Sequence, residues 1–130
     1  MQNIEIDFKL YVSDGSMTSF ITEGTYEDLG EYRSISFVED TTIKANTTID
    51  IYQERVLIKR LGEMNMTMEY IMGMDTTLYL TTNFNYDISM NNYTSFLEIT
   101  EDTINIIYQT QIDKEQNLTH NLFLKWHFIN

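Results

Sequence analysis

The chain of 130 residues contains neither cysteine nor proline. Without cysteine it can form no disulfide, no thiolate nucleophile and no zinc or iron site that depends on Cys ligands. Proline lacks a backbone N–H and is largely excluded from the central strands of a sheet, so nothing in this sequence interrupts a continuous sheet. The missing residues therefore exclude several kinds of chemistry and favour a fold rich in strands.

Basic residues are scarce as well. The chain has 8 Lys and Arg residues against 20 Asp and Glu residues, which gives a formal net charge of -12. A surface of this sign repels polyanions and offers no basic stripe for phosphate contacts, so nucleic acid is not an expected partner. The carboxylates are scattered along the chain, which is typical of a solvated surface.

Long apolar runs are missing too. No stretch approaches the roughly 20 apolar residues that cross a bilayer, so we expect no membrane partner. The N-terminal segment carries Glu5, Asp7 and Lys9 where a secretion signal needs an unbroken apolar run. These observations favour a cytoplasmic protein.

The abundant feature is an alternation of apolar and polar residues with a period of two. It starts near the N-terminus and recurs from end to end. Successive side chains of a strand point to opposite faces, so the pattern predicts strands with one dry face and one wet face. In the first segment the apolar positions are Ile4, Ile6, Phe8, Leu10 and Val12.

Turn signals separate the predicted strands. Asp14-Gly15 suits the positive φ angles of a tight hairpin between the first two strands. Gly24, within the second strand, predicts a bulge or a sharp bend. Further strands are expected near residues 32–39, 47–52, 55–61, 63–75, 78–82, 86–90, 93–99, 104–112 and 118–128.

The segment 63–75 holds Met64, Met66, Met68, Tyr70, Met72 and Met74 at strictly alternate positions. A helix is the alternative, because Met is a good helix former and several of these residues also fall on a 3.6-residue stripe. The strand is favoured because every even position fits and Gly62 and Gly73 bracket the run.

Regularly spaced short strands without a convincing helix pair describe an all-β sandwich or barrel. The barrel is favoured because closure removes the exposed edges that would otherwise promote aggregation. We therefore predict an all-β fold in which residues 1–130 form a single domain, one antiparallel β-barrel of about eight to ten strands.

The run of residues 56–73 carries a distinctive spacing of Arg, Gly, Met and Tyr. Its marked positions are Arg60, Gly62, Met66, Tyr70 and Gly73. The pattern resembles the core motif of the YwiB-like family, small bacterial proteins of unknown function, and the likeness extends from Gly24-x-Tyr26 through Thr82 and Phe84 to the last strand. The resemblance implies a calycin-like, lipocalin-like β-barrel, a shape that does not by itself define a function.

A barrel of this size is either filled by its own side chains or leaves room for one small apolar ligand. Met side chains adapt to irregular ligand shapes, and aromatic rings can line a pocket. The alternative is that the same residues fill the core, where Met commonly serves as a gap filler. The candidate ligand-binding residues are Met66, Met68, Tyr70, Trp126 and Arg60, with Met64, Met72 and Phe128 as further candidates.

Arg60 continues the inward face of Val56 and Ile58, and a guanidinium in that position needs an acceptor. One interpretation is that it anchors a ligand carboxylate at the barrel mouth. The other is that it lies at a strand end, either paired with a carboxylate such as Glu39 or exposed to water.

No pattern in the chain predicts catalysis, a metal site or a cofactor. His120 lies on an apolar face, whereas His127 has the opposite parity, so the two cannot easily share a metal ion. Paired carboxylates fall in predicted turns, which suit solvated charge better than acid catalysis. Neither a nucleophile elbow nor a glycine-rich phosphate loop is present, and we expect a protein that is not an enzyme.

Three functions remain open. The first is non-enzymatic binding of a small hydrophobic or amphipathic ligand inside the barrel. The second is a structural or interaction protein with a fully packed core, with a homodimer as one form. The outward-facing apolar residues that motivate the second function are Leu57, Leu61, Phe123 and Ile129. The third is an enzyme with an unrecognised site, to which no residue points.

Overall fold

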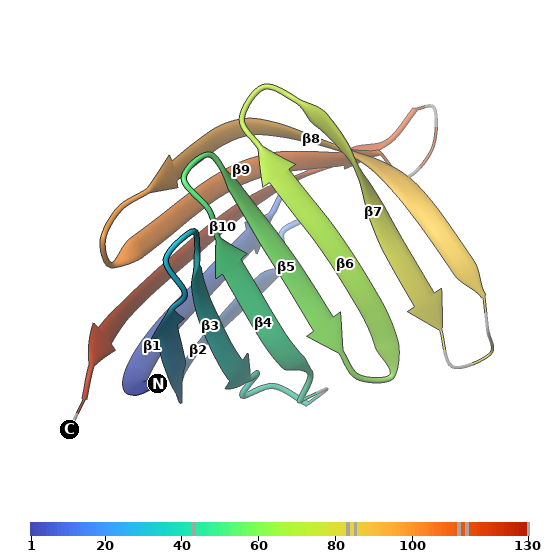
Figure 1. Cartoon of the computed structure of the whole chain (residues 1–130). Coiled ribbons are helices and arrows are strands. Elements are labelled where there is room, and N and C mark those ends of the chain that lie inside the picture. The colour runs from blue at the N-terminus through green and yellow to red at the C-terminus, as the bar shows by residue number, and fades with distance from the viewer. Residues whose placement is uncertain (43, 83, 85, 112, 114, 130) are drawn as a thin grey trace.

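Figure 1 shows the computed structural model of the chain, which describes residues 1–42, 44–82, 84, 86–111, 113 and 115–129. Within these residues the chain forms ten β-strands that close into one barrel, so the predicted all-β barrel is confirmed. The strands are β1 (Gln2–Val12), β2 (Met17–Asp28), β3 (Arg33–Val38), β4 (Asn46–Ile51), β5 (Arg55–Leu61), β6 (Met64–Ile71), β7 (Asp75–Thr82), β8 (Asp87–Ile99), β9 (Thr103–Gln111) and β10 (Asn117–Phe128).

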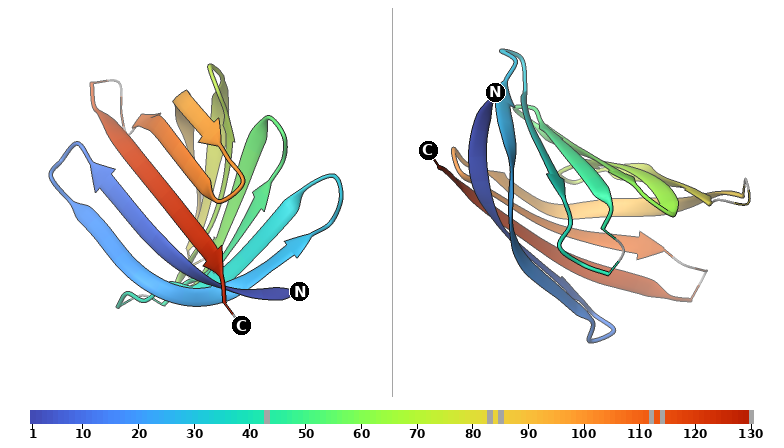
Figure 2. Two further views of the ribbon diagram at one scale, coloured as in Figure 1. Left: turned by 90° about the vertical axis from the view of Figure 1, so that its left-hand side faces the viewer. Right: turned by 90° about the horizontal axis from the view of Figure 1, so that it is seen from below.

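Each strand pairs antiparallel with the next one in the sequence, and β10 pairs with β1 to close the barrel. Both views in Figure 2 show β1 and β10 side by side, with the two termini near the same end. Among the ten described strands, closure therefore leaves none with a free edge. The turns after the odd-numbered strands lie at one end, which we call the mouth, and those after the even-numbered strands lie with the termini at the other end, the closed end.

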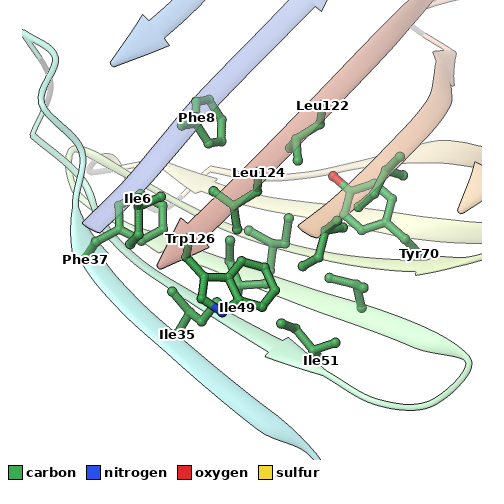
Figure 3. Packing of buried hydrophobic residues seen from close by; sticks show 14 of the residues in the cluster. Ile6, Phe8, Ile35, Phe37, Ile49, Ile51, Tyr70, Leu122, Leu124 and Trp126 are labelled. Carbon is green, nitrogen blue, oxygen red and sulfur yellow. The ribbon is translucent and has the colours of Figure 1, made fainter. Parts of the chain in front are cut away.

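The barrel interior is built from the alternating apolar positions that the sequence predicts. On β1, Ile4 and Ile6 are completely buried, and on β10 Leu124 and Trp126 are buried as well. Figure 3 shows Ile6, Leu124 and Trp126 converging with other buried side chains on one cluster inside the barrel. Each such side chain contributes about 1.5–3 kcal/mol by leaving water, so the cluster is the main source of stability.

The closed end is filled by Trp126 and covered by Arg33. The guanidinium of Arg33 donates from Nη1 to the carbonyl oxygen of Glu101 at 2.9 Å and from Nη2 to that of Thr100 at 3.0 Å. Its Cζ lies 5.7 Å from the centre of the Trp126 ring, within the range of a cation–π contact. Arg33 therefore ties the β8–β9 turn to the aromatic core at this end.

The methionine-rich segment is strand β6, so the helix alternative is wrong. The strand ends at Ile71 and Gly73 follows in a turn with a φ of 76°. The predicted strand was therefore correct in type but extended too far, because Met72 and Met74 belong to the exposed turn region. Of the remaining methionines, Met68 is buried, whereas Met64 is 51% exposed near the mouth.

One strand prediction is wrong, and one of the two forms predicted for Gly24 is absent. The two strands expected at 86–90 and 93–99 are one continuous strand, β8, in which an irregularity between Thr94 and Phe96 shifts the register with β9. At Gly24 the pairing runs through without a shift, so the bulge is absent, whereas the register does not test the other form of that prediction, a sharp bend. A Cβ on Gly24 would collide with the carbonyl oxygen of Ser36, so the glycine permits a close approach of backbones. The end of the strand predicted at residues 104–112 falls on residue 112, which lies outside the described residues.

Candidate ligand cavity

A cavity of about 300 Å³ occupies the barrel between mid-height and the mouth. It extends from Ile49 in the middle of β4 to Val12 and Leu118, which adjoin mouth turns. Its apolar lining consists of Phe8, Leu10, Val12, Ile49, Ile58, Met66, Met68, Leu78, Leu118 and Leu122. Its polar lining consists of Thr18, Glu39, Thr47, Arg60, Tyr70, Tyr108, Thr110 and His120.

The structure brings four of the five predicted site residues to this cavity: Arg60, Met66, Met68 and Tyr70. It does not bring Trp126 there, because Trp126 fills the closed end. Figure 3 shows Trp126 well apart from Tyr70. The further candidate Phe128 is 55% exposed at the closed end and packs edge-on against Tyr26, with ring centres 5.1 Å apart.

Arg60 and Glu39 form an ion pair at the cavity wall. Nε of Arg60 donates to Oε2 of Glu39 at 2.6 Å, and Nη2 donates to Oε1 at 2.8 Å. Thr47, which lies opposite Arg60 in the β4–β5 ladder, donates its hydroxyl to Oε2 of Glu39 at 2.6 Å. Both carboxylate oxygens are thus satisfied, and the interpretation in which Arg60 pairs with Glu39 is confirmed.

Two tyrosines lie on the cavity wall near Arg60. The rings of Tyr70 and Tyr108 have centres 4.8 Å apart, and the hydroxyl of Tyr70 donates to the Met68 sulfur at 3.1 Å. Burial raises the pKa of both tyrosines, while the positive charge of Arg60 opposes that shift. Both phenols are therefore neutral hydrogen-bonding groups at physiological pH.

His120 completes the polar part of the lining, on the β10 side. Its ring stacks on that of Tyr108 with centres 4.5 Å apart and planes 6° apart. Both ring nitrogens are buried, and among the described residues neither has a hydrogen-bond partner. Burial lowers the pKa of His120, and the nearby charge of Asp14 offsets part of that effect. The imidazole is consequently neutral at pH 7.

His127 lies apart from this cavity, as its opposite parity predicts. Its side chain is 61% exposed, and its Nε2 lies 3.7 Å from Oε1 of Glu5 on the outer surface. In the part of the chain that the structure describes, no three His, Cys, Asp or Glu residues lie together in a way that could hold a metal ion. Nor does any helix among those residues have the length and apolar character required to cross a membrane.

Sequence reasoning missed several lining residues as members of the site, notably Tyr108, Thr110 and His120. Their signal was present, because each has the inward parity of its strand. What the sequence did not reveal is that these three line the same cavity as Arg60 and Tyr70, since that depends on the pairing of β9 with β10 and on closure.

The fold and the cavity define a class of protein: a closed antiparallel β-barrel with a small, largely apolar chamber and a few polar groups on its wall. The sequence matches the family model described as a domain of unknown function, DUF1934, over residues 3–124, and the chain belongs to this family. Among solved structures, the ywiB protein from Bacillus subtilis is similar in fold, with a TM-score of 0.84 and 18% sequence identity. The match covers 99% of this chain and 93% of that one. No curated protein matches the sequence.

Proposed function

We propose that the protein binds one small hydrophobic or amphipathic molecule in the barrel cavity and catalyses no reaction on it. The observation that carries this proposal is the cavity of about 300 Å³ with its mainly apolar lining. Protein cores normally leave few voids larger than a water molecule, whereas ligand pockets begin at about 300 Å³. An apolar cavity of about 150 Å³ accepts benzene, so this one has room for a ligand of about a dozen non-hydrogen atoms.

The side chains of the wall are suited to binding. Met66 and Met68 are flexible and can adjust to the shape of a bound molecule. Most of the wall surface is apolar, and the polar side chains supply the hydrogen-bonding groups that orient a ligand in such pockets. Among the described residues His120 has no carboxylate or hydroxyl partner to orient it as a general base, which favours binding over catalysis.

The alternative function, an interaction protein with a fully packed core, has less support. The cavity argues against complete packing. Of the four outward residues that motivate an interface, Leu61 is 55% exposed, whereas Leu57, Phe123 and Ile129 are already half-buried within the protomer. A homodimer therefore stays a prediction, tested below. The binding proposal includes a cytoplasmic location, which fractionation of cells producing the full chain tests.

The experiment compares a variant that fills the cavity with a matched variant on the outer surface. Leu118→Trp adds a large ring to the cavity wall at the start of β10, and Asn121→Trp adds the same ring to an exposed position of the same strand. With 1-decanol as the probe in isothermal titration calorimetry, we expect one binding site in the wild type, at least tenfold weaker binding in Leu118→Trp and unchanged binding in Asn121→Trp.

Native mass spectrometry of freshly purified protein provides an independent readout, because a natural ligand appears as added mass on the folded chain. Absence of 1-decanol binding together with absence of any co-purified small molecule would refute the proposal. Equal binding of 1-decanol by Leu118→Trp and the wild type would refute the cavity as the binding place.

A further inference from the structure

The charged side chains of the cavity wall cancel one another. Among the described lining residues, the acidic and basic side chains are those of Glu39 and Arg60. These two form the pair with two hydrogen bonds described above. The carboxylate of Glu39 is 7% exposed, and the side chain of Arg60 is 33% exposed. A ligand in the cavity therefore meets a guanidinium whose charge is already neutralised by a buried carboxylate.

The other polar groups on the wall add no charge at neutral pH. The two phenols stay protonated, because burial raises the pKa of Tyr70 and of Tyr108. His120 stays neutral, because burial lowers its pKa. The whole chain carries a formal charge of -12, so the long-range field gives no compensating attraction to an anion.

The wall nevertheless offers hydrogen-bond donors. Glu39 occupies Nε and one N–H of Nη2 on Arg60, which leaves the Nη1 amino group outside that pair. An uncharged oxygen can accept from such a donor without bringing a charge into the barrel. A ligand carboxylate in the same place would lose its hydration without forming a full ion pair, because the Arg60 guanidinium is already paired with Glu39. A buried charge without a partner is strongly unfavourable.

We propose that the cavity, if it binds ligands as proposed above, selects an uncharged amphiphile with a hydrogen-bond acceptor in its head group, such as an alcohol, ester or amide. Glu39 is the residue that sets this selectivity, because its carboxylate neutralises Arg60. The inference reverses the sequence-based interpretation in which Arg60 anchors a ligand carboxylate.

The first test uses the wild-type protein and three probes with the same ten-carbon chain: 1-decanol, decanoate and decylammonium. Isothermal titration calorimetry at pH 7.5 compares their dissociation constants below the micelle-forming range. We expect 1-decanol to bind at least tenfold more tightly than either ion. Decanoate or decylammonium binding as tightly as 1-decanol would overturn the inference while leaving the proposed binding function intact. If none of the three probes binds, the inference fails, and the proposed function fails with it when native mass spectrometry also finds no co-purified small molecule.

The second test releases the charge of Arg60. Glu39→Gln preserves the shape of the side chain but removes its negative charge, so we expect decanoate to bind at least tenfold more tightly than to the wild type, with 1-decanol changed less than threefold. Glu69→Gln is the matched control, because Glu69 accepts from Arg55 at 2.8 Å in a pair that does not line the cavity. Equal gains in decanoate binding in both variants, or none in Glu39→Gln, would overturn the role of Glu39. Circular dichroism checks folding, and the wild-type comparison decides the selectivity even if Glu39→Gln does not fold.

Discussion

Removal of Arg60 should destabilise the barrel through the carboxylate that it leaves behind. In Arg60→Met the apolar stem is retained, but Glu39 stays inside the wall with the Thr47 hydroxyl as its remaining partner. Breaking a buried ion pair costs about 3–5 kcal/mol. Because a third of the Arg60 side chain contacts water, part of that cost is screened, and we expect a loss of about 2–3 kcal/mol in the free energy of unfolding.

Urea denaturation followed by circular dichroism measures this loss, and a double-mutant cycle identifies its cause. In Arg60→Met/Glu39→Gln the stranded charge is gone, so at least half of the lost stability should return. The matched cycle uses Arg55→Met and Glu69→Gln, whose side chains are 43% and 33% exposed and whose pair should contribute at most about 1 kcal/mol. A loss below about 1 kcal/mol in Arg60→Met, or no recovery in the double variant, would refute the reasoning about the buried pair.

Further predictions concern His120, Gly24, Arg33 and the oligomeric state. Burial lowers the pKa of His120, so the unfolded chain binds a proton at this side chain at higher pH than the folded chain does. The free energy of unfolding should therefore fall as the pH drops from about 7.5 to 5.5. His120→Asn should flatten that pH dependence in urea titrations. In Gly24→Ala the free energy of unfolding measured by urea denaturation should fall by about 2 kcal/mol or more, because the new methyl group collides with the backbone of Ser36. Stability equal to that of the wild type would contradict the close approach of the two backbones. Arg33→Met should lose about 1–2 kcal/mol by the same assay, because two hydrogen bonds to carbonyl oxygens of the exposed β8–β9 turn and the cation–π contact with Trp126 disappear. An unchanged denaturation midpoint would contradict the role of Arg33 at the closed end. Size-exclusion chromatography with light scattering tests the homodimer, and a monomer at all accessible concentrations would exclude it.

The period-two alternation predicted most of the architecture, because parity alone decides which face a strand residue occupies. It placed Met68 and Tyr70 inside the barrel, and the structure agrees. The sequence also offered Glu39 as an example of a carboxylate partner for Arg60, and the structure pairs the two side chains. The strands were misjudged where local composition resembles a turn, as in the Asn-rich middle of β8 around Asn92, which is buried and paired within the sheet.

Parity does not give the height of a residue along the barrel axis, and this is why Trp126 was misplaced. His120 pairs with Val12 beside the mouth, whereas Trp126 pairs with Ile6 near the other end of β1. They are six positions apart on β10, and at about 3.3 Å per residue they lie roughly 20 Å apart. Both point inward, but only His120 reaches the cavity. Only the register between β1 and β10, which depends on the positions of the turns, shows that His120 and Trp126 lie at different heights along the barrel axis.

The same difference in level explains why the barrel is hollow at one end and filled at the other. Near the closed end the inward positions carry bulky groups, including Trp126 and Tyr26, whose ring centres are 6.5 Å apart, with Arg33 over the indole. Toward the mouth several inward positions carry threonine, namely Thr18, Thr47 and Thr110. A β-branched side chain suits a strand but fills far less of the barrel than an aromatic ring, so the interior is underfilled at that level. Strand parity decides which residues point inward at every height of the barrel. The size of those residues at each height then decides whether a cavity is left.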